Sequence, residues 1–291
     1  MTDSGKKNDN TDAPTGKNSY TRRDVIRTGS SAVTLGVLAA AFGAALPKGA
    51  RAQDSAKGVD ALTIVYPAGE GLTFNADYYR DHHLKTIMKL YGNTIQRMEL
   101  RKVPGPAAGA AAPPPPAAGA PPPPPRYAAA INIWINDLAA FNASNQKHGK
   151  TLTDDVPNFT NAQPVIQFDK FHGEMGAARS APKIGDTCLT ILYPNSDGVR
   201  WDVDYYKKGH MPLIMRLYGE KAIKRFELRK GDAGMAPGSK PAFIGSVNIY
   251  INDQAAFDAA GKLHTQTLVQ DVPHFSSVNP NAFPSVIHGI G

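Results

Sequence analysis

One stretch of the sequence is written twice, and the rest of the chain is organised around it. The first copy reads Leu62-Thr-Ile-Val-Tyr-Pro67, then Phe74-Asn-Ala-Asp-Tyr-Tyr-Arg-Asp-His-His-Leu84, and ends Lys89-Leu-Tyr-Gly92. The second reads Leu189-Thr-Ile-Leu-Tyr-Pro194, then Trp201-Asp-Val-Asp-Tyr-Tyr-Lys-Lys-Gly-His-Met211, and ends Arg216-Leu-Tyr-Gly219. Residues 62–92 align with 189–219 without a gap, and about half of the pairs are identical.

A second block repeats in the same way. Residues 127–157 align without a gap with 243–273, again with about half of the pairs identical. Solenoid repeats have periods of roughly 20 to 50 residues, and this spacing is far longer. The pattern therefore indicates a duplicated domain, and a functional site is expected to come in pairs.

Each copy predicts the same order of elements. An apolar, β-branched run closed by proline predicts a first strand. Asn75 and Asp202 are good N-caps for a first helix, and Gly92 and Gly219 suit its C-terminal end. The segments 95–102 and 223–230 alternate apolar and charged residues, which is typical of a strand with one face in water. Strands at 127–135 and 243–251 precede second helices, capped by Asp137 and Asp253, that are expected to run to about His148 and His264. Last strands are expected at 165–171 and 283–290.

The order strand-helix-strand-strand-helix-strand is the ferredoxin-like arrangement, with both helices on one face of a four-stranded sheet. The uncovered face must be buried, and the second copy can cover it. We therefore predict an α+β fold in which two ferredoxin-like βαββαβ repeats, residues 53–175 and 176–291, form an intrachain pseudo-dimeric α/β barrel. The Pro/Ala/Gly-rich segment 103–126 is expected to be an exposed insert between two strands; a role as a tether for a partner is left open.

Composition excludes some function classes. The chain has 291 residues and a formal charge of +7, but most of this excess lies in residues 1–52, and the body has no basic run. Nucleic-acid binding is therefore not expected. Cys188 is the single cysteine. It precedes a predicted strand, where a small buried thiol is the expected role.

The first 52 residues have the features of an export signal. Thr21-Arg22-Arg23-Asp24 precedes an apolar Ala/Gly/Leu/Val stretch at about 32–46, and Ala50-Arg51-Ala52 fits the small-x-small cleavage pattern. Paired arginines before a modest apolar segment resemble a twin-arginine signal. We expect cleavage near Ala52, delivery to the periplasm by the twin-arginine export machinery, and no membrane anchor.

The motifs in both copies resemble the EthD family of small dimeric α/β-barrel proteins. The pattern Phe/Trp-x-x-Asp-Tyr-Tyr-x-x-x-His, the Leu-Tyr-Gly that follows and the Asp155-Val-Pro-Asn-Phe159 segment carry the resemblance, which covers residues 62–291. It implies a pocket between helices and sheet, and an oxidoreductase-associated or unknown function. Related barrels include haem enzymes, cofactor-free oxygenases and enzymes acting on ring compounds. The second copy lacks the Asn-Phe-Thr-Asn run of the first, so the two sites are not expected to be equal.

The candidate catalytic residues are His83 and His210 as proton-transfer groups, with Tyr79 and Tyr206 orienting them. Each histidine follows a tyrosine, Tyr79 or Tyr206, by about one helical turn. A neutral imidazole beside a phenol can move a proton to or from a small organic molecule. The alternative is that each histidine only packs and supports the fold.

Other repeated residues are candidates for the pocket: His148, His264, Tyr78, Tyr205, Asp155 and Asp271. In this fold His83 could face His148, and His210 could face His264. Two histidines with Asp155 or Asp271 could bind a metal, although the spacing does not require one. Asp77 and Asp204 are expected to favour the helix dipole rather than act in catalysis.

The sequence thus predicts an exported EthD-like protein, an enzyme of oxidoreductase type or a cofactor-free acid/base catalyst, acting on a small apolar or aromatic molecule. No cofactor or metal is predicted. A non-catalytic binding or carrier protein and a haem or metal-binding barrel are the alternatives, and further homodimerisation is left open. The substrate cannot be read from the sequence.

Overall fold

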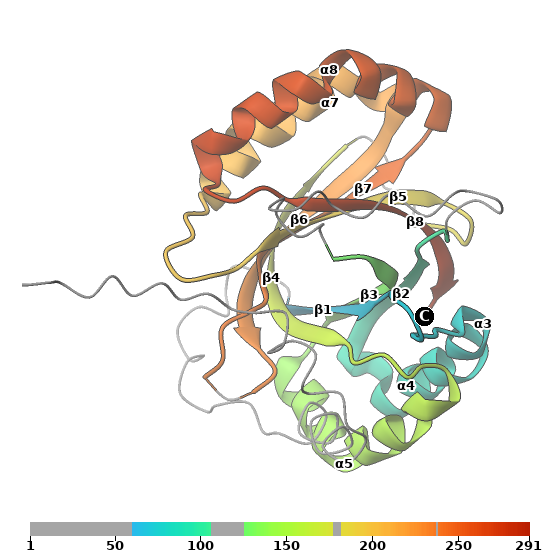
Figure 1. The fold of residues 1–291 in the computed structure, drawn as a ribbon. Coiled ribbons are helices and arrows are strands. Elements are labelled where there is room, and N and C mark those ends of the chain that lie inside the picture. The colour runs from blue at the N-terminus through green and yellow to red at the C-terminus, as the bar shows by residue number, and fades with distance from the viewer. Residues whose placement is uncertain (1–59, 106–124, 177–181, 237) are drawn as a thin grey trace, which may run out of the picture. The chain divides into compact units, whose positions relative to one another are not determined.

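The computed structural model describes residues 60–105, 125–176, 182–236 and 238–291. The expected signal peptide and residues 106–124 of the insert lie outside these ranges. Both repeats lie within them and can be compared element by element (Figure 1).

The first repeat contains the six expected elements. Strand β1 is Asp60–Pro67, and the first helix consists of α3 (Ala76–Tyr78), a π-helical turn (Tyr79–His83) and α4 (Leu84–Tyr91). Strands β2 (Ile95–Lys102) and β3 (Tyr127–Ile135) precede α5 (Leu138–Asp155) and β4 (Val165–Met175). Short 3₁₀ turns at Gly92–Thr94 and Val156–Asn158 follow the two helices.

The second repeat has the same order. Strand β5 is Thr187–Pro194, followed by α6 (Val203–Tyr205), a π-helical turn (Tyr206–His210) and α7 (Met211–Ala222). Then come β6 (Ile223–Gly234), β7 (Phe243–Ile251), α8 (Gln254–Phe275) and β8 (Asn281–Ile290). Asn75 and Asp202 cap the first helices as expected, because each side chain accepts a backbone N–H three residues later.

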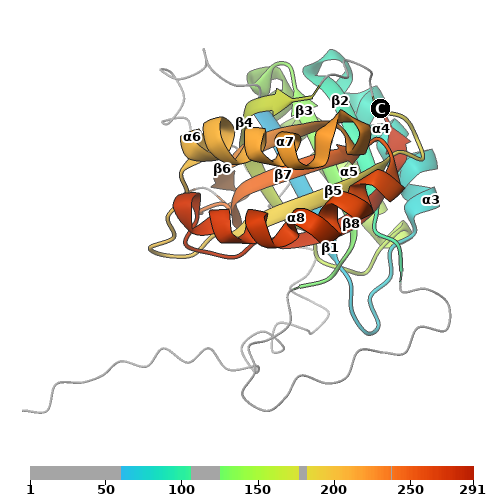
Figure 2. The same ribbon diagram turned by 90° about the horizontal axis from the view of Figure 1, so that it is seen from above.

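The eight strands close into one barrel in the order β1-β3-β2-β8-β5-β7-β6-β4. All of these pairs are antiparallel. The pairs β2–β8 and β4–β6 join the two repeats. Figures 1 and 2 show α4 and α5 on one side of the barrel, and α7 and α8 lying along the opposite side. The predicted fold of two repeats forming an intrachain barrel is confirmed.

The second helices are longer than predicted. They continue past His148 and His264 to Asp155 and Phe275. Proline lacks a backbone N–H and opposes the interior of a helix. In α8 the helix nevertheless passes through Pro273, close to its end. The extra turns place Asp155 and Asp271 on helices rather than in loops.

The charged faces of β2 and β6 were predicted to be in water, and this was wrong. Glu99, Arg101, Glu227 and Arg229 are all at most 2% exposed. The alternation itself was real: Met98 and Leu100 pack beneath the helices of the first repeat, so the charged residues between them point the other way. Closure of the barrel turns that second face into its interior.

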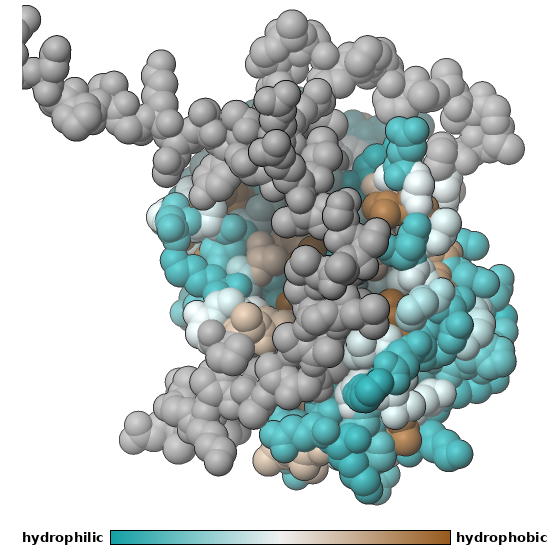
Figure 3. Space-filling model, turned by 60° about the horizontal axis from the view of Figure 1, so that its bottom comes forward, coloured by the Kyte–Doolittle hydropathy of each residue, from teal (hydrophilic) through white to brown (hydrophobic). Residues whose placement is uncertain are grey.

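Apolar residues form one core under each helix pair. Figure 3 shows mostly hydrophilic residues with small separate groups of hydrophobic ones on one face of the molecule. Among the described residues, no helix has the length and hydropathy needed to span a membrane.

Candidate functional site

Both candidate histidines lie at the end of a π-helical turn. In the first repeat the N–H of Leu84 bonds to the carbonyl of Tyr79, five residues earlier. Met211 and Tyr206 make the same bond in the second repeat. Single π turns inside α-helices occur often at functional sites. Here the wider turn brings the Tyr79 and His83 rings to a centroid distance of 4.9 Å.

A carboxylate from the second helix holds the imidazole of His83. The Nδ1 atom of His83 lies 2.8 Å from Oδ2 of Asp155. Oδ1 of Asp155 accepts hydrogen bonds from the Tyr78 hydroxyl and from the Asn158 side-chain amide, each at 2.8 Å. With Asp155 ionised, the proton of a neutral His83 sits on Nδ1, which leaves the Nε2 lone pair free.

Burial sets the charge of this pair. It lowers the pKa of His83 below its ordinary value, against the opposing hydrogen bond and charge of Asp155. Burial also acts to raise the pKa of Asp155, but hydrogen bonds from Asn158, His83 and Tyr78 outweigh it, and that pKa lies below its ordinary value. At neutral pH the pair is therefore a neutral imidazole beside a carboxylate.

The second repeat reproduces the arrangement. Nδ1 of His210 lies 2.7 Å from Oδ2 of Asp271, and the Tyr205 hydroxyl donates to Oδ1 at 3.0 Å. Burial again lowers the pKa of His210. His274 occupies the position of Asn158, with Nδ1 3.3 Å from Oδ1 of Asp271.

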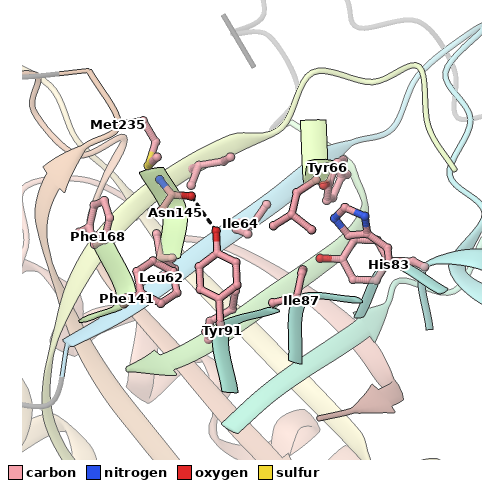
Figure 4. A pocket seen from close by; sticks show the side chains of 14 residues that line it. Leu62, Ile64, Tyr66, His83, Ile87, Tyr91, Phe141, Asn145, Phe168 and Met235 are labelled. Atoms are coloured by element: carbon pink, nitrogen blue, oxygen red, sulfur yellow. Dashed lines mark hydrogen bonds between the residues drawn. The ribbon is translucent and has the colours of Figure 1, made fainter. Parts of the chain in front are cut away.

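A pocket opens beside His83 between the helices and the sheet of the first repeat (Figure 4). The space open to the centre of a water molecule is about 20 Å³, room for one or two waters. Its walls are mostly apolar. Within the first repeat they come from strands β1, β3 and β4, the π-helical turn and helices α4 and α5. The lining residues are Leu62, Ile64, Tyr66, Tyr79, His83, Ile87, Tyr91, Ile133, Phe141, Asn145, Leu152, Ile166, Phe168 and Met235. Met235 is contributed by the second repeat.

The pocket has polar groups away from its His83 end. The Tyr91 hydroxyl donates to Oδ1 of Asn145 at 2.8 Å, and Figure 4 shows this bond apart from the His83 ring. Asn145 is only 8% exposed. Its amide N–H groups make no hydrogen bond to any described residue, so they remain available to a bound molecule.

The same region of the second repeat is built differently. Trp201 stands where the first repeat has Phe74, and its ring lies 4.2 Å from that of Tyr193, the counterpart of Tyr66. Gly245 makes room for the larger ring, because a Cβ there would lie 2.3 Å from Trp201. Gly261 stands where the first repeat has Asn145. The second repeat therefore keeps the histidine and aspartate but lacks the side-chain amide of Asn145.

The structure brings together some of the predicted site residues and not others. Tyr78, His83 and Asp155 form one hydrogen-bonded group, and Tyr205, His210 and Asp271 form its counterpart. Tyr79 and Tyr206 contact the imidazoles through their rings. His148 and His264 are half-buried, and no hydrogen bond or ion pair of the described residues joins either to His83 or His210.

Sequence reasoning missed Tyr91, Asn145 and Met235. Tyr91 is the tyrosine of the repeated Leu-Tyr-Gly motif, which was interpreted only as the end of a helix. Asn145 falls at a position where the two copies differ, so the repeat gave no signal for it. Met235 lies in the second repeat, and nothing local links it to a pocket in the first.

Residues 72–163 match the EthD domain family. An EthD-like protein from Ralstonia eutropha JMP134 is 28% identical, covering 36% of this chain and 93% of its own, with a TM-score of 0.34. An anthrone oxidase-like protein is 8% identical over 81% of this chain and 94% of its own (TM-score 0.44). A chlorite dismutase from Candidatus Nitrospira defluvii is 7% identical over 78% and 91% (TM-score 0.40).

Comparison with curated proteins gave no match. Sequence motifs of the first repeat agree with the match to residues 72–163. These include the Tyr-Tyr-x-x-x-His segment and the Asp-Val-Pro-Asn-Phe segment, both of which lie within the matched range. The chain thus carries an EthD domain at residues 72–163.

Proposed function

We propose that the pocket of the first repeat is the active site of an enzyme that removes a proton from a small apolar or aromatic molecule, with His83 as the general base. The observation that carries this proposal is the 2.8 Å contact between Nδ1 of His83 and Asp155, beside a pocket that His83 helps to line. A histidine used only for packing does not need an ionised partner that itself accepts two further hydrogen bonds.

The chemistry follows from the charges of the pair. A proton leaves the substrate for Nε2 of His83, and the electron pair of the broken bond stays on the substrate. The imidazolium that forms is stabilised by Asp155, which already accepts the Nδ1 proton. Tyr78 and Asn158 keep the carboxylate in place. An oxidoreductase could use the same proton transfer as one of its steps.

The pocket walls define the substrate class. Aliphatic and aromatic side chains favour an apolar ring or chain, and the Asn145 amide can donate to one oxygen or nitrogen at the other end. The present space is small, so a substrate must displace a side chain. Met235 is the candidate, because an unbranched thioether adapts to different shapes.

The first repeat is proposed to be the working one. Both repeats contain the histidine and aspartate, but Gly261 stands in the second where Asn145 gives the first its amide. Export to the periplasm, predicted from residues 1–52, remains part of the proposal.

A haem or metal at His83 was the alternative. The Nε2 atom of His83 would be the donor to either group. Among the described residues, no three His, Cys, Asp or Glu side chains gather as a metal site. The step proposed above is written with side chains of this chain.

Deuterium exchange tests the proposal without knowledge of the natural substrate. The full-length protein is incubated in D₂O with phenols and aromatic ketones that carry a weakly acidic C–H, and exchange is followed by proton NMR. We expect catalysed exchange by the wild type and by His210→Gln, and a loss of roughly 10²- to 10⁴-fold in His83→Gln. Binding without exchange would favour the carrier alternative. Equal exchange by His83→Gln would refute the role of His83.

A further inference from the structure

Two hydroxyl groups in the wall of the pocket have no part in the proton transfer described so far. Three tyrosines line this pocket together with His83: Tyr66, Tyr79 and Tyr91. The Tyr91 hydroxyl donates to Oδ1 of Asn145. The hydroxyls of Tyr66 and Tyr79 make no hydrogen bond to any described residue, although both side chains belong to residues that are at most 3% exposed.

These two tyrosines lie at the same end of the pocket as His83. Strand β1 contributes Tyr66 and the π-helical turn contributes Tyr79, and their ring centroids are 6.3 Å apart. Both rings pack against Phe159, at 5.9 and 5.0 Å, and the imidazole of His83 packs against the same ring at 4.6 Å. Figure 4 shows Tyr66 and His83 at one end of the pocket and Asn145 at the other.

Packing alone does not explain the two hydroxyls. Phe74 lies in the same aromatic cluster, 4.8 Å from the ring of Tyr66 and 5.7 Å from that of Tyr79. A phenylalanine fills nearly the same volume without burying a donor, and a buried hydroxyl without an acceptor is unfavourable. Burial raises the pKa of Tyr66 and of Tyr79 above the ordinary value, so both keep their protons. They are therefore unpaired donors in the wall of a pocket, which indicates a ligand that supplies the acceptor.

Proton transfer to His83 creates a need for such donors. Burial lowers the pKa of His83, so its imidazole is a weak base, and the charge left on a carbon atom must be stabilised for the proton to leave. A carbonyl beside that carbon takes the charge onto its oxygen, where fixed donors stabilise it. Because this oxygen is only two bonds from the reacting carbon, its donors must lie at the His83 end, where Tyr66 and Tyr79 are.

We propose that the Tyr66 and Tyr79 hydroxyls form an oxyanion-binding pair, and that the substrate of this pocket is a ketone with a C–H bond beside its carbonyl. This inference rests on the proposed role of His83 as the base. The C–H bond breaks, its proton goes to Nε2 of His83, and its electron pair forms the C=C bond of an enolate. The carbonyl π electrons move to the oxygen, which accepts a hydrogen bond from each hydroxyl. Return of a proton to the carbon regenerates the ketone, and in D₂O the returning atom is deuterium.

The probes are 2-indanone and indene, which share a fused ring and differ in the carbonyl. Each is incubated with the full chain in D₂O, exchange of the ring CH₂ groups is followed by proton NMR, and exchange without protein is subtracted. The parent chain carries His210→Gln, so that only the first repeat contributes. We expect catalysed exchange of 2-indanone and none of indene, because indene has no oxygen to accept from the tyrosines.

The deciding variants are Tyr66→Phe and Tyr79→Phe, which keep the rings and remove the hydroxyls. Each should lower kcat for exchange of 2-indanone by roughly 10²- to 10³-fold. KM should change less, because hydrogen bonds to the oxygen strengthen as its charge develops. Stability in urea should be equal to or above that of the parent, because no acceptor is lost. Tyr218→Phe is the matched control and should exchange like the parent, because Tyr218 packs against Phe257 rather than lining this pocket.

The outcomes separate this inference from the proposed function. Exchange that is lost in His83→Gln but retained in the Tyr66→Phe/Tyr79→Phe double variant would overturn the oxyanion pair and leave the role of His83 intact. Equal catalysis with 2-indanone and indene, or a loss of rate matched by a loss of stability, would also overturn the pair. A parent chain that exchanges neither probe, although it binds 2-indanone, would overturn the proposed function and this inference together.

Discussion

Replacing Asp155 by asparagine tests the electrostatics of the proposed site directly. Asp155 raises the affinity of His83 for a proton, against the larger effect of burial, which lowers the pKa. The His83 side chain is 2% exposed and that of Asp155 is 22% exposed, so solvent screens the pair only in part. Asparagine retains the shape and an acceptor oxygen but removes the charge.

The size of the effect follows from the kind of bond lost. Hydrogen bonds to charged groups contribute about 1.5–3 kcal/mol, and neutral ones about 0.5–1.5 kcal/mol. The difference of roughly 1–1.5 kcal/mol corresponds to about one pKa unit. We therefore expect Asp155→Asn to lower the pKa of His83 by about one unit. The imidazole would then stay neutral to lower pH but be a weaker base.

The assay is an NMR titration of the imidazole nitrogens in protein labelled with ¹⁵N. Asp271→Asn should shift His210 by a similar amount and leave His83 unchanged. Asp154→Asn is the matched control, because Asp154 pairs with exposed Lys150 at 2.6 Å and not with His83. If the pKa of His83 rises or does not change in Asp155→Asn, the assigned role of Asp155 is wrong.

Three further predictions concern stability and reactivity. Gly245→Ala should lower the free energy of unfolding by about 1–3 kcal/mol, because the added methyl group overpacks against Trp201. Adding Trp201→Phe to the same chain should recover much of this loss in urea unfolding. If the effects of the two substitutions on the free energy of unfolding are simply additive, the proposed packing is wrong. Burial raises the pKa of Asp169 to about 6, so its contribution to stability is full below about pH 4 and is lost as the pH rises through 6. The loss is about 3 kcal/mol and should be absent in Asp169→Asn. Cys188, whose pKa is about 11, should react with iodoacetamide near pH 8 only after denaturation.

Repeat and periodicity were sufficient to predict most of the fold. The six elements of each copy, the capping residues Asn75 and Asp202 and the closure of two sheets on each other all follow from local patterns and from the need to cover an apolar face. The ends of α5 and α8 were predicted too early: α5 continues to Asp155, and α8 continues through Pro273 to Phe275.

The site was only partly predictable. The repeated Tyr-Tyr-x-x-x-His segment identified His83 and His210, and repetition also marked Asp155 and Asp271. Their pairing was not predicted, because it joins residues 72 and 61 positions apart on different helices. Differences between the copies, such as Asn145 and Gly261, acquire meaning only once the pocket is known.

The sequence by itself determined that the protein is a duplicated domain with a paired histidine, because local pattern and self-similarity need no knowledge of distant contacts. Only the tertiary structure decided which carboxylate holds each histidine and that Tyr91 and Asn145 line the pocket beside His83. It also decided that the charged faces of β2 and β6 are buried rather than wet. The sequence pattern of an alternating strand is the same whether its polar face lies in water or in the interior of a barrel. The environment of that face is fixed only when the two repeats close into the barrel.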